Sequence, residues 1–389
     1  MSVKQATTAS NGVRVAIFAA EPGSGNGRAL RMAQSLAEAG YRPTLYTDAS
    51  GVALCPQGVE VECCLTLGDH DTPVTLSRVP DLTGMAVVQA CGRELLRQVT
   101  PHVPESAKLI YDVPTAEPLP VAPEGAGLRA RGRSWLAGIK SSVGAWRAAP
   151  RIDAAICPSY IFGEFLQREM KLKQVPVVPI YPALPLVDEI VPDPEIWADR
   201  KRPVVAVLGG DFADLEAAIH AVARVRELDL MVVNGHGDWQ VAEDMASGYR
   251  RMAGRLHRVD VSPERVLGTI AGCELGMVLP LDSSQQALYD IPAQLFVLLM
   301  AGVPVVASDL PGLERLVLAQ NFGLLADPED LEQVANQVGR AWSDRPNHER
   351  LVYNVDLVRR HRYSWEVQAT RLLTLYAQLT VVTTVAEKA

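Results

Sequence analysis

Short runs of apolar residues, each followed by a polar loop and a helical pattern, recur along most of the chain. The first run, Arg14–Ala20, leads into a glycine-rich loop and then into a helical segment over Arg28–Gly40. Near-continuous apolar strands that alternate with helices are typical of a parallel sheet covered on both faces. The first half therefore predicts a doubly wound sheet, whose further strands are Pro43–Asp48, Val59–Leu67, Ala86–Gly92, Lys108–Val113, Ala154–Ser159 and Val177–Pro182.

The pattern stops over Leu184–Pro203, where four prolines and clustered charge predict an interdomain linker. Beyond it the alternation of strand and helix restarts and predicts a second parallel sheet. After Asp330 the chain is predicted to be helical. The strands expected in the second half are Val204–Phe212, Leu228–Asp238, Leu256–Val261, Leu275–Leu281, Val303–Asp309 and Phe322–Pro328.

Glycines come directly after several predicted strands, in the loops that lead into the next helix or turn. They are Gly23, Gly25 and Gly27 in the first half, and Gly209, Gly210, Gly235 and Gly237 in the second. A loop glycine before a helix lets backbone N–H groups approach an anion. Each glycine alone is more typical of an ordinary turn. Their repetition at corresponding strand ends favours ligand binding at the carboxyl ends of both sheets.

Composition narrows the function classes. The 389 residues fit two domains, and 37 basic against 45 acidic residues give a net charge of −8, which argues against a nucleic-acid partner. The longest uncharged stretch, Ile291–Ser308, is interrupted by two prolines and a glycine, so it predicts a buried helix and strand. Six cysteines and seven histidines show no metal-ligand spacing. We expect a cytoplasmic protein with reduced cysteines and no bound metal.

Several segments, in their order along the chain, resemble the retaining GT-B glycosyltransferases of the group 1 (GT4-like) family. The most specific is PAQLFVLLMAGVPVVASDLPGLERLV (Pro292–Val317), which is similar to the family's helix–turn–strand block after the nucleotide-sugar site. Arg151–Leu166 resembles the last strand, serine and helix of the acceptor half. VVNGHGDW (Val232–Trp239) resembles a Gly-x-Gly turn of the donor half, and Arg362–Tyr376 resembles the closing helix.

The resemblance implies an α/β fold of GT-B architecture, with two Rossmann-like domains that face a central cleft. Residues 1–190 would bind the acceptor, residues 200–360 the nucleotide-sugar, and the helix within 361–389 would cross back to the first domain. The implied reaction transfers a sugar from a nucleotide-diphosphate donor to a glycan, lipid-linked or small-molecule acceptor in polysaccharide or glycoconjugate synthesis. No permanently bound cofactor is expected.

The resemblance also implies candidate site residues. Asp112, in the stretch Leu109–Pro120 at the end of a strand, is the candidate catalytic residue, although a structural turn or cap aspartate is an equal alternative. The loop with Gly23, Gly25 and Gly27 would face the acceptor. The candidate donor-binding residues are Gly209, Gly210, His236, Ser283, Ser284, Tyr289 and Gln294.

The sequence departs from the family where charge matters most. The family places an arginine and a lysine in the loop after the first strand of the donor domain. Here that loop, Gly209–Ala217, holds Asp211 and Asp214 and nothing basic. No lysine occurs between Arg202 and Glu387, and Val297 replaces a glutamate that typically binds the donor ribose. Leu109–Pro120 also lacks the family's histidine.

These departures keep other functions open. The first alternative is a catalytically degenerate protein that serves as a binding or scaffold partner of an active glycosyltransferase. The second is a nucleotide-sugar epimerase of the same fold, which would need paired acids in the cleft.

The segment 129–147 carries five basic residues, no acidic residue and two tryptophans. A basic amphipathic helix of this kind suits peripheral contact with an anionic membrane. A sheet-covering helix with a solvated basic face is the preferred interpretation.

Overall fold

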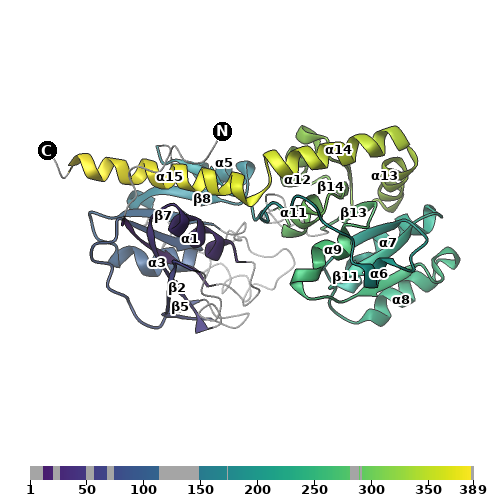
Figure 1. The fold of residues 1–389 in the computed structure, drawn as a ribbon, viewed down its shortest axis with the longest axis horizontal. Coiled ribbons are helices and arrows are strands. Elements are labelled where there is room, and N and C mark those ends of the chain that lie inside the picture. The colour runs from purple at the N-terminus through teal and green to yellow at the C-terminus, as the bar shows by residue number, and fades with distance from the viewer. Residues whose placement is uncertain are drawn as a thin grey trace, which may run out of the picture. The chain divides into compact units, whose positions relative to one another are not determined.

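The structure is a computed structural model, and it describes residues 12–20, 27–49, 57–67, 74–113, 149–172, 174–280, 289 and 291–386. The predictions for Gly23, Gly25, Ser283, Ser284 and 129–147 lie outside the described residues. The chain divides into two compact units (Figure 1). The first unit comprises Met1–Tyr181 and Gln368–Ala389, and the second comprises Pro182–Val367.

The first unit contains a parallel sheet with the order β3-β2-β1-β6-β7-β8-β9 in its described part. The strand order reverses between β1 and β6, because β2 and β3 lie on one side of β1 and the later strands on the other. The elements are β1 (Arg14–Phe18), α1 (Arg28–Glu38), β2 (Arg42–Thr47), β3 (Glu60–Cys63), β4 (Leu65–Thr66), β5 (Thr75–Leu76), β6 (Val87–Cys91), α3 (Arg93–Val99), β7 (Lys108–Asp112), β8 (Ile152–Cys157), α5 (Tyr160–Glu169), β9 (Val177–Pro179) and most of α15 (Trp365–Ala386).

One predicted strand is divided in the structure. The apolar run Val59–Leu67 forms β3, which pairs parallel with β2, and then β4, which pairs antiparallel with β5. Cys64 lies between them, is fully buried, and donates its N–H to the carbonyl of Thr47. The short β4–β5 pair therefore leaves the main sheet after Cys64, a change of direction that an uninterrupted apolar pattern does not reveal.

Helix α15 belongs to the core of the first unit from Gln368 onward (Figure 1). Leu372, Leu375 and Tyr376 are buried, and the Tyr376 ring packs edge-on against Tyr41 with ring centroids 5.9 Å apart. The last part of the chain thus completes a unit that its first part begins.

The second unit contains a parallel sheet with the described order β12-β11-β10-β13-β14-β15. Here the strand order reverses between β10 and β13. The elements are α6 (Pro194–Trp197), β10 (Val204–Leu208), α7 (Glu216–Arg224), β11 (Asp229–Val233), α8 (Trp239–Ser247), β12 (Leu256–Val259), α9 (Val266–Ile270), β13 (Leu275–Val278), α11 (Ala293–Met300), β14 (Val305–Ser308), α12 (Pro311–Gln320), β15 (Gly323–Ala326), α13 (Leu331–Ser343) and α14 (Arg345–His361).

The predicted linker Leu184–Pro203 belongs to the second unit. Within it α6 begins after Asp193, whose side chain accepts a hydrogen bond from the N–H of Glu195. The Trp197 indole donates to the carbonyl of Thr269 at 3.0 Å and packs directly over Gly272, where a Cβ would lie 2.4 Å from the ring. One tryptophan thus anchors a segment whose composition is that of a linker.

No helix in the described ranges combines the length and apolar character needed to cross a membrane.

We predict that Gly272→Ala destabilises the second unit by about 1–3 kcal/mol, because the added methyl group overpacks against Trp197. Gly339→Ala is the matched control. In the middle of α13 its Cβ would approach Val225 no closer than 3.9 Å, so alanine should stabilise the helix by about 0.5–1 kcal/mol. Urea unfolding followed by circular dichroism measures both changes. Equal effects of the two substitutions would contradict this packing account.

Candidate functional site

A cavity of about 210 Å³ lies in the second unit where the strand order reverses. Loops leave neighbouring strands in opposite directions at such a point and open a crevice beyond the carboxyl ends of the strands. The ends of β10 and β13 form one side, and the start of α11 contributes Pro292 and Gln294. The full lining is Val207, Leu208, Gly209, Gly210, Asp211, Asp214, Leu215, Ala218, Met277, Val278, Leu279, Pro280, Pro292 and Gln294.

The cavity brings together three of the predicted donor-binding residues. Gly209 and Gly210 have positive φ angles of 59° and 81°, which L side chains rarely adopt. A Cβ on Gly209 would lie 3.5 Å from the side-chain nitrogen of Gln294. The N–H of Gly209 donates to the carbonyl of Val233, whereas the N–H of Gly210 donates to no group within the described part of the chain. A backbone donor is therefore available at the cavity wall.

His236 lies beside this loop and does not line the cavity. Its N–H donates to the carbonyl of Gly210 and its carbonyl accepts from the N–H of Phe212, both at 3.0 Å. The flanking glycines permit this approach, because a Cβ on Gly235 would lie 2.4 Å from the Phe212 ring. A Cβ on Gly237 would lie 2.7 Å from a carboxylate oxygen of Asp211. The Gly-His-Gly turn thus supports the cavity loop through its backbone.

Tyr289 is half-buried, and its neighbours 281–288 and 290 lie outside the described residues.

The described cavity lining carries two acidic side chains, Asp211 and Asp214, and no basic one. The nearby linker arginines do not supply the charge. Arg202 forms an ion pair of 2.8 Å with Asp229, the first residue of β11, at the opposite end of the sheet. Arg200 packs over the Trp197 ring and donates to the carbonyl of Ile196.

The start of helix α11 contributes Pro292 and Gln294 to the cavity lining and brings the partial positive charge of a helix N-terminus to it. Its N-cap is Pro292, no side chain caps the first turn, and no acidic residue lies in that turn. The partial positive charge and free N–H groups at a helix N-terminus favour an anion. Val297, the position of the family's glutamate, lies half-buried further along the same helix. In the described lining, neutral side chains and backbone groups are therefore the ones that can bind an anion.

Asp112 lies at the end of β7 in the first unit and is fully buried. Its carboxylate pairs with a guanidinium nitrogen of Arg28 at 2.6 Å. It also accepts hydrogen bonds from the Gln89 side chain at 2.7 Å and from the Cys91 thiol at 3.3 Å. The Tyr376 hydroxyl donates to the Gln89 carbonyl oxygen at 2.5 Å. The polar network Arg28–Asp112–Gln89–Tyr376 thus joins α1, β7, β6 and α15.

These contacts place Asp112 as the counterion of Arg28. A buried carboxylate that pairs with a guanidinium and accepts further hydrogen bonds has its charge and its lone pairs satisfied inside the protein. The neighbouring thiols are not nucleophiles, because burial raises the pKa of Cys91 and raises that of Cys157 to about 12. This network could not be predicted from the sequence, because its four residues are far apart along the chain. The placement of Arg28 directly after the predicted glycine loop is the one signal that could have indicated it.

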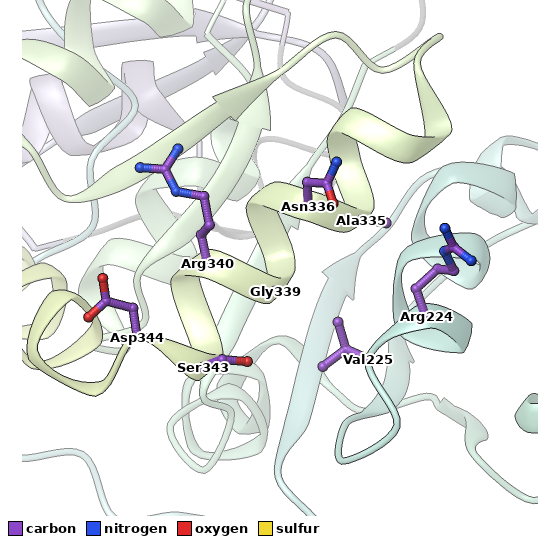
Figure 2. A pocket seen from close by; sticks show the side chains of 8 residues that line it. All are labelled: Arg224, Val225, Ala335, Asn336, Gly339, Arg340, Ser343 and Asp344. Carbon is purple, nitrogen blue, oxygen red and sulfur yellow. The ribbon is translucent and has the colours of Figure 1, made fainter.

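A larger, open groove of about 620 Å³ lies elsewhere on the second unit, between α7 and α13 (Figure 2). Figure 2 shows Arg224 on one side and Asn336 and Arg340 on the other. Arg224 is the last residue of α7, which precedes the start of β11, so the groove lies toward the amino ends of the strands. It is therefore not at the edge where ligands of such sheets bind.

No cluster of three or more histidine, cysteine, aspartate or glutamate side chains among the described residues is arranged to hold a metal ion.

Comparison with solved structures shows which fold this is. The sucrose-phosphate synthase of Thermosynechococcus elongatus matches with a TM-score of 0.66 at 16% identity, covering 95% of this chain and 99% of the enzyme. Anabaena HepE in complex with UDP-glucose matches with a TM-score of 0.65 at 13% identity, covering 94% and 99%. WaaG, a glycosyltransferase involved in lipopolysaccharide biosynthesis, matches with a TM-score of 0.60 at 15% identity, covering 92% and 98%.

Two parallel α/β units in this arrangement along the chain are the GT-B fold, as the sequence predicted. Neither a protein-family model nor a curated protein sequence matches the chain. The similarity to the solved structures is therefore one of fold.

We predict that Asp112→Ala destabilises the first unit by about 3–5 kcal/mol, because it leaves the Arg28 guanidinium buried without its counterion. The double variant Arg28→Met/Asp112→Leu should lose less stability than Asp112→Ala, since an apolar pair leaves no buried charge. Thermal unfolding of both variants measures the difference. Glu349→Ala, which breaks an exposed ion pair with Arg345, is the control and should change little. A double variant less stable than Asp112→Ala would refute the counterion role.

Proposed function

We propose that the chain is a glycosyltransferase that moves a sugar from a nucleotide-diphosphate donor to an acceptor hydroxyl. In this proposal the second unit binds the donor and the first unit binds the acceptor. The observation that carries it is the cavity at the reversal point of the second sheet, which gathers Gly209, Gly210 and Gln294. Anabaena HepE has been solved with UDP and with UDP-glucose, which supports a uridine nucleotide as the first donor to test.

Backbone groups would recognise the diphosphate. The N–H of Gly210 and the uncapped first turn of α11 present donors to the same cavity. These groups cost no side-chain entropy and need no lysine, which the stretch from Arg202 to Glu387 lacks. The cavity is smaller than the roughly 300 Å³ of a pocket for a whole small molecule, so it suits one portion of the donor.

Transfer with retained configuration requires no dedicated protein base. The bond between the sugar's anomeric carbon and the diphosphate oxygen breaks, and a bond from the acceptor oxygen to that carbon forms on the same face. The acceptor's proton passes to the departing diphosphate, whose negative charge grows as the bond breaks. Stabilising this charge is the main catalytic task. Asp112 has no part in it, because its carboxylate is buried against Arg28.

One observation favours a second function, that of a catalytically degenerate partner of an active glycosyltransferase. Both ionisable side chains in the described cavity lining, Asp211 and Asp214, carry the same sign of charge as a diphosphate. Uncompensated like charges weaken binding in a partly enclosed site. If the cavity bound no nucleotide, the GT-B fold would serve here as a scaffold.

Nucleotide binding discriminates the two functions. We predict that UDP raises the melting temperature of the purified chain in a saturable manner, and that UDP-glucose or a related UDP-sugar is slowly hydrolysed in the absence of acceptor. GDP, ADP and CDP are the comparison ligands. If none of the four diphosphates changes the melting temperature and no nucleotide-sugar is consumed, the scaffold function replaces the enzymatic one.

We further predict that Asp214→Asn tightens UDP binding several-fold at low ionic strength, because it removes a negative charge from the exposed rim of the cavity. Asp244→Asn is the matched control. It removes an equal charge from the surface of α8, where the carboxylate accepts a hydrogen bond from Gln240 and does not line the cavity. Isothermal titration of both variants gives the affinities. Equal affinities would show that UDP does not occupy this cavity.

A further inference from the structure

The first unit contains a buried cation whose hydrogen bonds are incomplete. The Arg28 side chain is 9% exposed. Its Nη1 donates to Asp112 at 2.6 Å and its Nε donates to the carbonyl of Ile180 at 3.3 Å. Its Nη2 is buried and donates to no group among the described residues. A buried donor without an acceptor costs about 1–3 kcal/mol, so an oxygen that accepts from this nitrogen would be stabilised by that amount.

The position of Arg28 is that of a ligand-binding residue. It opens α1, directly after the glycine loop that leaves β1, and β1 and β6 are the strands between which the sheet order reverses. Asp112 reaches it from the carboxyl end of β7, and Gln89, in the middle of β6, donates to Asp112. Ligands of doubly wound sheets lie at this reversal point, beyond the carboxyl ends of the strands. The first unit thus repeats the arrangement that forms the cavity of the second.

The start of α1 favours an oxyanion beside Arg28, whose own charge Asp112 balances. The first turn of α1 contains no acidic residue, and the N-cap Gly27 offers no side-chain oxygen. The partial positive charge at the N-terminus of this 11-residue helix therefore acts on the same group as the guanidinium. Asp48, the buried carboxylate after β2, follows a strand on the opposite side of β1 from β7.

We propose that Arg28 binds a phosphate or carboxylate group of the acceptor through its Nη2, while Asp112 holds the guanidinium in place. Gln89 fixes the second carboxylate oxygen of Asp112, and Tyr376 fixes Gln89. The sugar acceptor is therefore an anionic one, a sugar phosphate or a sugar acid. This inference rests on the proposed function, which assigns the acceptor to the first unit.

Binding of three sugars at constant ionic strength tests the proposal: glucose 6-phosphate, glucuronate and neutral glucose. Thermal shift and isothermal titration should show saturable binding of the phosphate or the carboxylate, and the two anionic arms distinguish which oxyanion fits. Glucose should bind at least about tenfold more weakly, since it lacks the charge that the guanidinium recognises. Equal binding of all three sugars, or no binding of either anion, would overturn the inference.

Two variants locate the site. R28K keeps a cation beside Asp112 but loses the two N–H groups of Nη2, so the anion should bind about tenfold more weakly. R28Q/D112N removes both charges together and should abolish anion binding. R151Q is the control, because Arg151 is a part-buried arginine of the same unit whose guanidinium, within the described residues, donates to the carbonyls of Val103 and Pro104. It should bind the anion as the unaltered protein does.

UDP separates failure of this inference from failure of the proposed function and also reports folding. The donor cavity lies in the second unit, so a folded R28Q/D112N protein should retain the UDP-induced shift. If R28Q/D112N retains UDP binding and also binds the anion as the unaltered protein does, Arg28 has no part in anion binding and the proposed function still stands. Absence of UDP binding in the unaltered protein would refute the proposed function.

Discussion

Parallel strands that share a sheet must all end at the same edge, and this constraint gathers the loops and helix starts of each unit there. Each sheet places its first strand in the interior and adds strands on both sides of it, so each has one point where the order reverses. The loops after β1 and β10 begin at these points, and both are followed by helices. Because the fold brings only loops and helix starts to this edge, the residues there decide what each unit binds.

The two reversal points differ in their electrostatics. The first has a buried guanidinium held by a carboxylate, with an amide and a phenol behind it. The second has two aspartates, a glutamine and glycines, and the N-terminus of α11 brings a partial positive charge to it. A fixed guanidinium binds a negatively charged group in a defined geometry. Backbone N–H groups bind an anion without needing any particular side chain. This difference underlies the assignment of an anionic acceptor to one unit and the donor to the other.

The strands and the fold class could be predicted from the sequence because buried parallel strands are uninterrupted apolar runs. The predicted runs around β1, β10 and β14 correspond closely to the observed strands. Local pattern failed at Cys64, where the chain leaves the sheet within one apolar run, and it did not reveal that Trp197 packs against Gly272. Both outcomes depend on partners distant in sequence.

The site shows the same division. Gly209, Gly210 and Gln294, which the sequence indicates as donor-binding residues, line one cavity, and their part in binding a donor stays a prediction. The partners of Asp112 were not, because Arg28, Gln89 and Tyr376 are separated from it by 84, 23 and 264 positions. An aspartate at a strand end looks the same in sequence whether it acts on a substrate or balances a buried arginine. The three-dimensional contacts add that Asp112 is paired with the buried Arg28.

Binding of a nucleotide-sugar at the reversal point of the second sheet can be mapped onto the backbone by hydrogen exchange of the whole chain, with and without saturating UDP. We expect UDP to slow exchange in the loop Gly209–Asp214 and in the first turn of α11, which contribute to the cavity lining. The groove between α7 and α13 should exchange at an unchanged rate. Unaltered exchange in both the loop and α11 at saturating UDP would show that the nucleotide does not bind there.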